Sequence, residues 1–168
     1  SDYGIRSLSK YHKDHPFVFQ HNGHYTIHYE PGESRSNMFG GNSNWRGPIW
    51  MPLNYMIIQS LRKYYTFYGP TYQYEFPTGS GKKLNLNEIA NELTKRLVRL
   101  FEPNSEGKFQ YHADDRNKLF SKDEHFKNQH LFYEFFDGDN GKGLGASHQT
   151  GWTALIANLI MEMDESES

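Results

Sequence analysis

The chain has 168 residues, which is enough to bury the core of one folded domain. Its 18 Lys and Arg nearly balance its 20 Asp and Glu, and a formal net charge of -2 argues against nucleic-acid binding, which normally requires a basic excess. The sequence has no cysteine and no apolar run of the roughly 18 residues that a transmembrane helix needs, so disulfides, thiol catalysis and a membrane span are excluded.

Aromatic residues are unusually frequent for a chain of low overall hydrophobicity. They make up 16% of the residues, while all hydrophobic residues together make up only 36%. Disordered chains are poor in aromatics, so this composition predicts a folded protein. Aromatic rings also offer flat apolar faces with polar edges, which suit a sugar-binding cleft. Composition alone leaves an aromatic-rich core and a ligand-lined cleft as equal alternatives.

The first predicted element is a β-hairpin at residues 17–30, followed by a loop. Apolar residues alternate from Phe17 to Tyr29 around Asn22-Gly23, the strongest short signal for a tight hairpin turn. Residues 31–47 contain four glycines together with several Asn and Ser, and this composition predicts a loop.

Three helices are predicted after this loop. The first covers residues 48–68, ends at Gly69-Pro70, and has this apolar face: Trp50, Leu53, Ile57, Leu61, Tyr64 and Tyr68. The second covers residues 86–101 and begins with a capping box of Asn85 and Glu88. Its apolar stripe is Leu86, Ile89, Leu93, Leu97 and Leu100. The third covers residues 151–163 and carries Trp152, Leu155, Ile156, Leu159, Ile160 and Met163 on one face.

A weaker helical pattern covers residues 123–132. With the three helices above, it predicts a fold that is mainly α, with one small β-hairpin near the N-terminus. The connections between the helices are long and rich in Gly, polar and aromatic residues. Loops of this length in a compact chain usually carry function.

Two kinds of site are considered and set aside. The segment Pro77-Thr78-Gly79-Ser80-Gly81-Lys82-Lys83 lacks the first Gly and the Ser or Thr of a phosphate-binding loop. The nine histidines are not spaced as paired zinc ligands on one face of a helix. Residues 137–148 resemble the start of a calcium-binding loop, but Gly141 and His148 stand where that loop needs ligands. We therefore expect no metal and no cofactor, with a looser Ca²⁺ loop at residues 137–141 as the alternative to a Gly-rich turn.

Polar and aromatic residues gather in three segments: residues 40–50, 133–141 and 147–152. The first brings two Trp and Arg46 to a helix start, the second places Glu134 between aromatics, and the third ends in Trp152. A carboxylate among aromatic side chains is suited to acid or base catalysis. The alternative is that Glu134 is a helix-end residue paired with Arg46 or a Lys.

These segments carry a family resemblance. The run Trp45-Arg46-Gly47-Pro48-Ile49-Trp50 with Asn54, then Tyr133-Glu134 before Gly138-Asp139-Asn140-Gly141, then His148-Gln149-Thr150-Gly151-Trp152, resembles the C-terminal part of glycoside hydrolase family 63. The likeness extends from residues 4–9 to the Trp152 helix. That family includes processing α-glucosidases and bacterial relatives that act on α-glucosides.

The resemblance implies a six-hairpin (α/α)6 toroid and an inverting reaction, in which an acid and a base about 6.5–9.5 Å apart leave room for water. Glu134 matches the general base. The matches to substrate-binding positions are Trp45, Arg46, Trp50, Asn54, Tyr133, His148, Gln149 and Trp152. Phe136-Asp137 departs from the Tyr-Asn of many members, which leaves the sugar contacts there open.

The resemblance also implies that residues 1–168 are the C-terminal segment of an incomplete toroid, because the family's general acid is an Asp upstream of the matching region. We expect an oligosaccharide or small α-glucoside as ligand, the remainder of the catalytic domain as partner, and little or no hydrolysis by the segment alone. The alternatives are a non-catalytic carbohydrate-binding fragment and a helical scaffold that self-associates through uncovered apolar faces.

The cytoplasm is the default expectation for the compartment. Residues 1–13 contain no apolar stretch typical of a secretory signal. The sequence also lacks an Asn-x-Ser/Thr acceptor for glycosylation.

Overall fold

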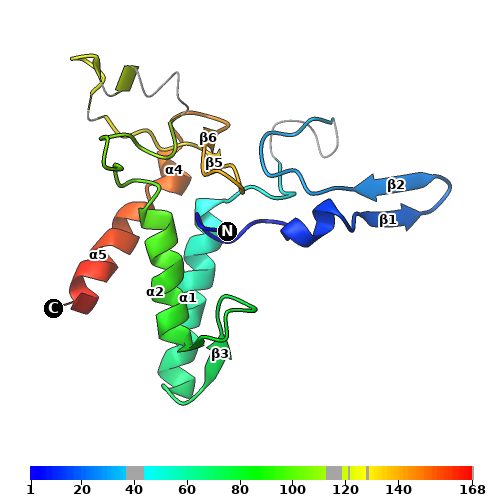
Figure 1. Ribbon diagram of the computed structural model, residues 1–168, viewed down its shortest axis with the longest axis horizontal. Helices are drawn as coiled ribbons and strands as arrows, with labels where there is room; N and C mark the ends of the chain where they lie inside the picture. The colour runs from blue at the N-terminus through cyan, green and yellow to red at the C-terminus, as the bar shows by residue number, and fades with distance from the viewer. Residues whose placement is uncertain (37–43, 113–118, 121, 128, 168) are drawn as a thin grey trace.

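The computed structural model describes residues 1–36, 44–112, 119–120, 122–127 and 129–167. The long helices α1 and α2 pack side by side with α5 against α2, and a layer of loops and short strands lies at one end of them (Figure 1). A two-stranded arm extends sideways from this loop layer (Figure 1).

The arm is the predicted hairpin. Strands β1 (Phe17–Gln20) and β2 (His24–Ile27) pair antiparallel, with Phe17 opposite Ile27. The turn forms where Asn22 and Gly23 adopt positive φ angles of 48° and 157°, which Asn and Gly tolerate best. A short 3-10 helix, η1 (Lys10–Lys13), precedes the arm, and the Ser9 side chain caps it.

Helix α1 (Met51–Tyr68) begins three residues later than predicted. Ile49 instead forms an isolated antiparallel bridge with Phe136, and Trp50 is the extended N-cap residue. The helix ends at Gly69, which has a φ of 72° and donates its N–H to the Tyr65 carbonyl.

The predicted apolar face of α1 was largely wrong. The buried residues of the helix are Met51, Asn54 and Ile58, while Leu53 and Ile57 are more than one-third exposed. Tyr64 and Tyr68 are also exposed. Apolar residues occupy two neighbouring stripes of this helix, and α2 covers only the one that contains Ile58.

A short hairpin that the sequence did not predict joins α1 to α2. Strands β3 (Gln73–Glu75) and β4 (Lys83–Asn85) pair antiparallel around the Gly-rich segment at residues 77–82. Within it, the Gly81 N–H donates to the Glu75 carboxylate at 2.7 Å, and Phe76 N–H donates to the Lys82 carbonyl at 2.9 Å. The segment is therefore a hairpin turn.

Helix α2 (Leu86–Val98) confirms its predicted capping box. The Asn85 side chain accepts the Glu88 N–H at 3.0 Å, and the Glu88 carboxylate accepts the Asn85 N–H at 2.8 Å. Of the predicted stripe, all residues but Leu86 are buried. The chain leaves the α-helix after Val98 in a tighter turn, so the helix is three residues shorter than predicted.

The predicted C-terminal helix is divided into α4 (Thr150–Thr153) and α5 (Ile156–Glu167) by a turn at residues 154–155. Ile156 and Leu159 of α5 are buried, whereas Trp152 and Ile160 are more than one-third exposed. The carboxylate of Glu162 accepts hydrogen bonds from Gln59 and Arg62, which ties α5 to α1.

The helix predicted at residues 123–132 was wrong. A single turn forms there, because the Asp123 carbonyl accepts the N–H groups of both Phe126 and Lys127, and the described residues from 129 to 133 have no regular structure. The chain then enters β5 (Phe135–Phe136), which pairs antiparallel with β6 (Gly143–Leu144).

The core lies between the three long helices and the loop layer. Aliphatic residues of the helices and Ile49 meet aromatic residues of the loop layer there: Ile49, Ile58, Leu93, Leu97, Tyr111, Tyr133, Phe136 and Leu159. Within the described ranges, no helix combines the length and the apolar character needed to cross a membrane.

Candidate functional site

All three tryptophans of the chain lie in one cluster. The Trp45 and Trp50 rings stack with 4.2 Å between centroids, and Trp152 meets Trp50 edge-on at 5.5 Å. Phe135 also stacks on Trp50, at 4.6 Å. Trp50 is 1% exposed, whereas Trp45 is 44% and Trp152 37% exposed. A buried indole thus supports two indoles that reach the surface, which is an arrangement suited to stacking on a ligand ring.

Glu134 stands directly before β5, next to the aromatic cluster. Its backbone N–H donates to the Ala146 carbonyl at 2.9 Å, and its carboxylate Oε2 accepts the Ala146 N–H at 3.0 Å. This reciprocal pairing fixes both the backbone and the side chain of a half-buried carboxylate. The alternative position at a helix end is excluded, because residue 134 precedes a strand.

A second carboxylate, which the sequence analysis missed, lies against the same stretch of backbone. The Gly145 N–H is 3.4 Å from Oε1 of Glu33, so Glu33 and Glu134 accept from adjacent amides. Glu33 belongs to the loop that follows the hairpin arm, far from Glu134 in sequence, and no pattern at residues 30–36 indicates this contact.

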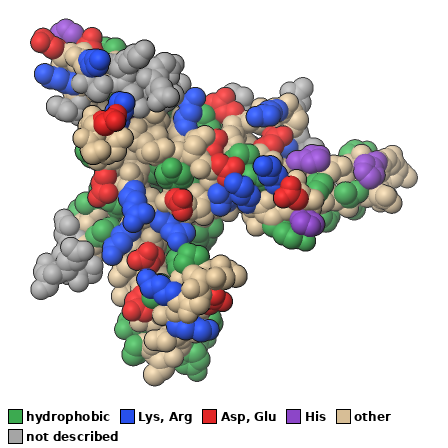
Figure 2. Space-filling view, in the orientation of Figure 1, with side chains coloured by type: hydrophobic (Ala, Val, Ile, Leu, Met, Phe, Trp, Pro, Cys, Tyr) green, Lys and Arg blue, Asp and Glu red, His purple; other side chains and the backbone are tan. Residues whose placement is uncertain are grey.

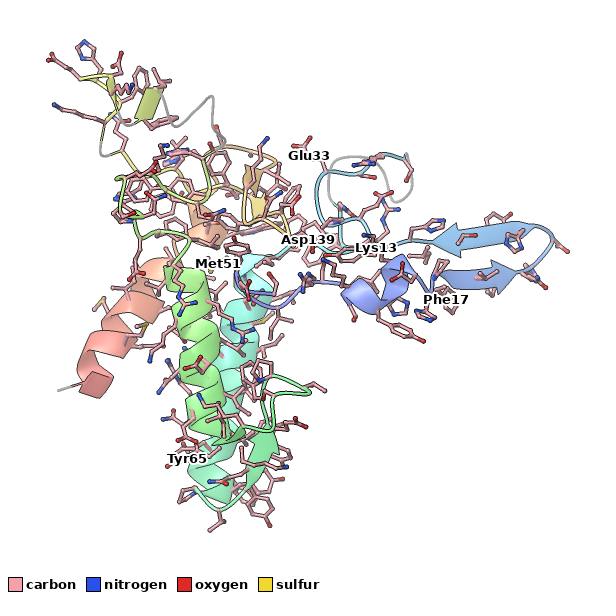
Figure 3. The ribbon with its side chains drawn as sticks, viewed as in Figure 1. Lys13, Phe17, Glu33, Met51, Tyr65 and Asp139 are labelled. Atoms are coloured by element: carbon pink, nitrogen blue, oxygen red, sulfur yellow. The ribbon has the colours of Figure 1, made fainter. Side chains whose placement is uncertain are left out.

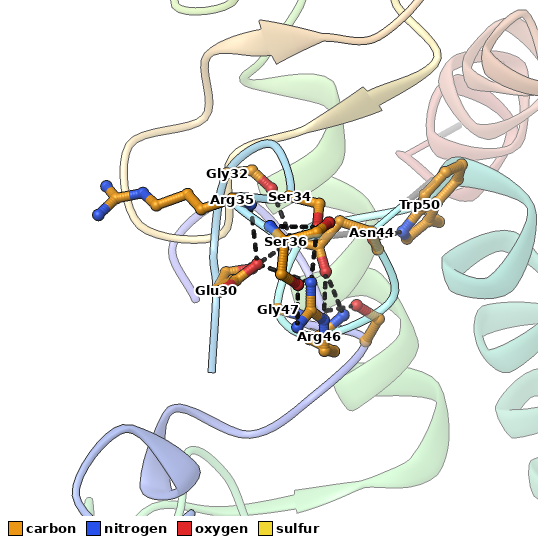
Figure 4. A network of polar contacts seen from close by, with 10 residues as sticks. Glu30, Gly32, Ser34, Arg35, Ser36, Asn44, Arg46, Gly47 and Trp50 are labelled. Atoms are coloured by element: carbon orange, nitrogen blue, oxygen red, sulfur yellow. Dashed lines mark hydrogen bonds and ion pairs between the residues drawn. The ribbon is translucent and has the colours of Figure 1, made fainter. Parts of the chain in front are cut away.

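Arg46 is the centre of a buried polar network (Figure 4). Its guanidinium donates to Glu30 at 2.7 Å and to Ser34 Oγ at 2.8 Å, and its Nε donates to Asn44 Oδ1 at 3.2 Å. Arg46 is only 5% exposed. Glu30 is the carboxylate that neutralises this guanidinium, so the structure does not support the alternative in which Glu134 pairs with Arg46.

Asn44 joins this network to the tryptophan cluster. Its Nδ2 donates to the carbonyls of Glu30 and Gly32, and its own carbonyl accepts the Trp50 indole N–H at 3.0 Å. The side-chain amide and the backbone carbonyl of this one buried residue consequently hold the loop at residues 30–36 and the Trp50 ring together (Figure 4). Residues 40–43 of the predicted polar segment lie outside the described residues.

Asn54 and Tyr133, two predicted substrate-binding residues, are built into the interior. Asn54 accepts the Ile5 N–H at 2.7 Å and donates to the carbonyls of Ile5 and Trp50. The Tyr133 ring is 1% exposed, and its carbonyl accepts the Thr153 hydroxyl. Both positions therefore hold the fold together, and their side chains are turned away from solvent.

His148 and Gln149 lie at the start of α4. His148 is exposed and its ring packs on Phe132 at 5.6 Å. Gln149 is the N-cap residue, and its carbonyl accepts the N–H groups of Trp152 and Thr153. Gln149 thus sets the position of Trp152 through the backbone of α4.

Asp139 anchors the turn between β5 and β6. Its Oδ1 accepts hydrogen bonds from Tyr29 at 2.8 Å, Arg6 at 3.0 Å and Lys10 at 3.2 Å. Burial by itself would raise the pKa of Asp139, but the hydrogen bonds from Tyr29, Lys10 and Arg6 outweigh it and lower this pKa below its usual range. Burial, and then the hydrogen bond to Asp139, raise the pKa of Tyr29. Within the described part of the chain, no group of three or more potential metal ligands is found.

Comparison with known proteins identifies relatives over nearly the whole chain. Residues 1–103 match the model of the glycosyl hydrolase family 63 C-terminal domain. The chain is 52% identical to an uncharacterized protein of Saccharomyces cerevisiae over 97% of the chain and 15% of that protein. It is 27% identical to the mannosyl-oligosaccharide glucosidase of Saccharomyces cerevisiae over 95% of the chain and 13% of that protein. It is 26% identical to alpha-glucosidase 2 of Arabidopsis thaliana, over 96% of the chain and 14% of that protein. The chain spans about one-seventh of the length of these relatives.

Proposed function

Since this chain belongs to glycosyl hydrolase family 63, we propose that it supplies the sugar-binding aromatics and the general base of a catalytic domain that hydrolyses α-glucosides. The observation that carries the proposal is the cluster of all three tryptophans beside the strand that follows Glu134. Relatives that are named as glucosidases support the substrate class.

The tryptophan cluster is the proposed sugar platform. Apolar ring faces of a glucose unit stack on the exposed parts of Trp45 and Trp152, while buried Trp50 keeps their geometry fixed. Arg46 contributes by holding the loop through Glu30 and Ser34. His148, which is exposed at the start of α4, remains available for hydroxyl groups.

Glu134 is the proposed general base of an inverting reaction. Its carboxylate removes a proton from a water molecule, whose oxygen forms a bond to the anomeric carbon as the glycosidic bond breaks. The leaving oxygen takes its proton from a carboxylic acid outside residues 1–168. The reaction uses no cofactor.

Residues 1–168 are proposed to be one segment of an (α/α)6 toroid. The exposed apolar stripe of α1 supports this proposal: Leu53, Met56, Ile57, Tyr64, Phe67 and Tyr68. Figure 2 shows hydrophobic side chains at the lower tip of the molecule, where α1 ends. A helix that is apolar on two faces is normally covered on both, so the remainder of the catalytic domain is the proposed partner.

The test uses the complete protein that contains this chain. Glu134→Gln is expected to lower the rate of α-glucoside hydrolysis by about 10²–10⁴-fold while ligand binding is kept. Glu102→Gln, an exposed carboxylate after α2, is the matched control and should leave the rate unchanged. Nuclear magnetic resonance of the first product should show inverted anomeric configuration. Activity that survives Glu134→Gln would show that this residue is not the base.

Binding can be measured on the chain itself, because all of its tryptophans lie in the cluster. Titration with maltose or with a glucose-shaped iminosugar should change the intrinsic fluorescence, and Trp45→Ala should remove most of that response. Binding without hydrolysis by the complete protein would favour the carbohydrate-binding fragment, and neither binding nor hydrolysis would favour a helical scaffold.

A further inference from the structure

A polar hollow of about 770 Å³ lies beside the Glu134 hairpin. It is bounded by the segment at residues 28–35 and by the turn between β5 and β6, and its lining includes these charged and amide side chains: Glu30, Glu33, Arg35, Asp137, Asn140 and Lys142. Charged side chains of both signs at such a surface favour water over an apolar ligand. In Figure 2, acidic and basic side chains are interspersed over this part of the molecule.

Glu33 connects this hollow to Glu134. It lines the hollow and accepts the Gly145 N–H, while Glu134 accepts the next amide, that of Ala146. A Cβ atom on Gly145 would lie only 2.6 Å from Glu134 Oε2 and 2.7 Å from the Phe135 ring, so glycine at this position leaves room for the Glu134 carboxylate. Glu33 extends from the loop layer on the side away from the helices (Figure 3).

The walls of the hollow are fixed by backbone contacts. The Gly138 N–H donates to the Pro31 carbonyl at 2.8 Å, and Asn44 holds the carbonyls of Glu30 and Gly32. Glu33 itself is exposed and its bond to Gly145 is long, at 3.4 Å, so a water molecule competes readily for its carboxylate. Hydrogen bonds therefore hold the walls of the hollow, and Glu33 is an exposed acceptor on its lining.

We propose that Glu33 is a positioning residue that holds the attacking water for Glu134, and that the hollow admits this water from solvent. The inference rests on the proposed function. A water that donates one O–H to Glu33 and the other to Glu134 presents its lone pair in a single direction, toward the anomeric carbon. Glu134 then takes the proton that faces it, and the second O–H, which donates to Glu33, becomes the new hydroxyl group on the anomeric carbon.

The test compares Glu33→Gln, Glu33→Ala and the control Glu102→Gln in the complete protein, with hydrolysis of an α-glucoside as the assay. Because a hydrogen bond to a charged acceptor is lost, kcat should fall about tenfold or more for both Glu33 variants. KM should stay within about twofold, because water, and not the sugar, contacts Glu33. Glu33→Asp should recover part of kcat.

Chemical rescue separates positioning from a merely structural role. Formate enters a hollow that is open to solvent, so it should raise kcat of Glu33→Ala, while chloride at equal ionic strength should not. A raised KM with unchanged kcat would overturn the inference in favour of sugar binding, and unchanged kinetics would overturn it outright. If the wild-type protein hydrolyses no α-glucoside, the proposed function fails. If Glu134→Gln abolishes hydrolysis and Glu33→Ala does not alter it, only the inference on Glu33 fails.

Discussion

Replacing Asn54 by alanine tests whether this side chain is a structural tie or a sugar ligand. Its amide oxygen accepts the Ile5 N–H at 2.7 Å, and its amide nitrogen donates to the Ile5 carbonyl at 3.1 Å and the Trp50 carbonyl at 3.0 Å. Asn54 is 1% exposed, so these bonds lie away from solvent. In Asn54→Ala, the N–H and C=O of Ile5 both lose their partner.

Each buried polar group left without a partner costs about 1–3 kcal/mol. The recess of about 170 Å³ that Asn54 shares with Ile5 and Trp50 has room for water, which offsets part of the loss. We therefore expect the free energy of unfolding to fall by about 2–3 kcal/mol in Asn54→Ala. Asn54→Asp should cost at least as much, because it keeps the acceptor but places a carboxylate against two carbonyl oxygens.

The assay is denaturant unfolding followed by tryptophan fluorescence, together with hydrogen exchange of the Ile5 amide. Ser60→Ala on the exposed side of the same helix is the control and should change the free energy of unfolding by no more than about 0.5 kcal/mol. An Asn54→Ala variant with unchanged stability and unchanged protection of the Ile5 amide would show that Asn54 is not a structural tie, and would favour a role for Asn54 in ligand binding.

Three further predictions concern the loop layer and the exposed stripe. Because the pKa of Asp139 is lowered in the folded state, its ionised form stabilises the fold above about pH 4, and this contribution is lost as the pH falls further. Unfolding measured at several pH values should therefore show that Asp139→Asn flattens the dependence of stability on pH below about pH 4. Gly47→Ala places a Cβ 2.7 Å from the Tyr29 ring at a φ of 148° and should lower the free energy of unfolding by about 2–4 kcal/mol. Gly79→Ala, whose Cβ meets no atom within 4 Å, should lower it by only about 1–2 kcal/mol. Equal losses for the two variants in denaturant unfolding would contradict the predicted clash at Gly47. Phe67→Ser removes an 82% exposed ring and should reduce self-association in sedimentation without lowering the free energy of unfolding by more than about 0.5 kcal/mol.

Local signals were sufficient where one pattern dominated the sequence. Helix α2 was predicted at its start because Asn85 and Glu88 form a capping box, and its single apolar stripe is the one that is buried. The β1–β2 hairpin was predicted because Asn22-Gly23 favours one type of tight turn. Both features depend on residues close together in the sequence.

Predictions failed where distant segments decide the outcome. Helix α1 carries two apolar stripes, and only the packing of α2 determines that Ile58 is buried while Ile57 is exposed. The bridge from Ile49 to Phe136 delays the start of α1, and no local pattern indicates it. At the candidate site, the motifs indicated the tryptophans and Glu134, but the ion pair between Arg46 and Glu30 and the position of Glu33 arise from contacts between loops.

The aromatic cluster of the site combines residues from two segments that are far apart in the sequence, and the ribosome makes these segments at different times. Trp45 and Trp50 leave the ribosome well before Phe135 and Trp152, which complete the cluster, and the Thr153 hydroxyl that binds the Tyr133 carbonyl follows later still. During that interval the helical pair of α1 and α2 can already form, because its contacts are nearer in sequence. The aromatic side chains of the site remain uncovered on the nascent chain until nearly the whole segment has been made, and this is the period in which chaperone protection matters most.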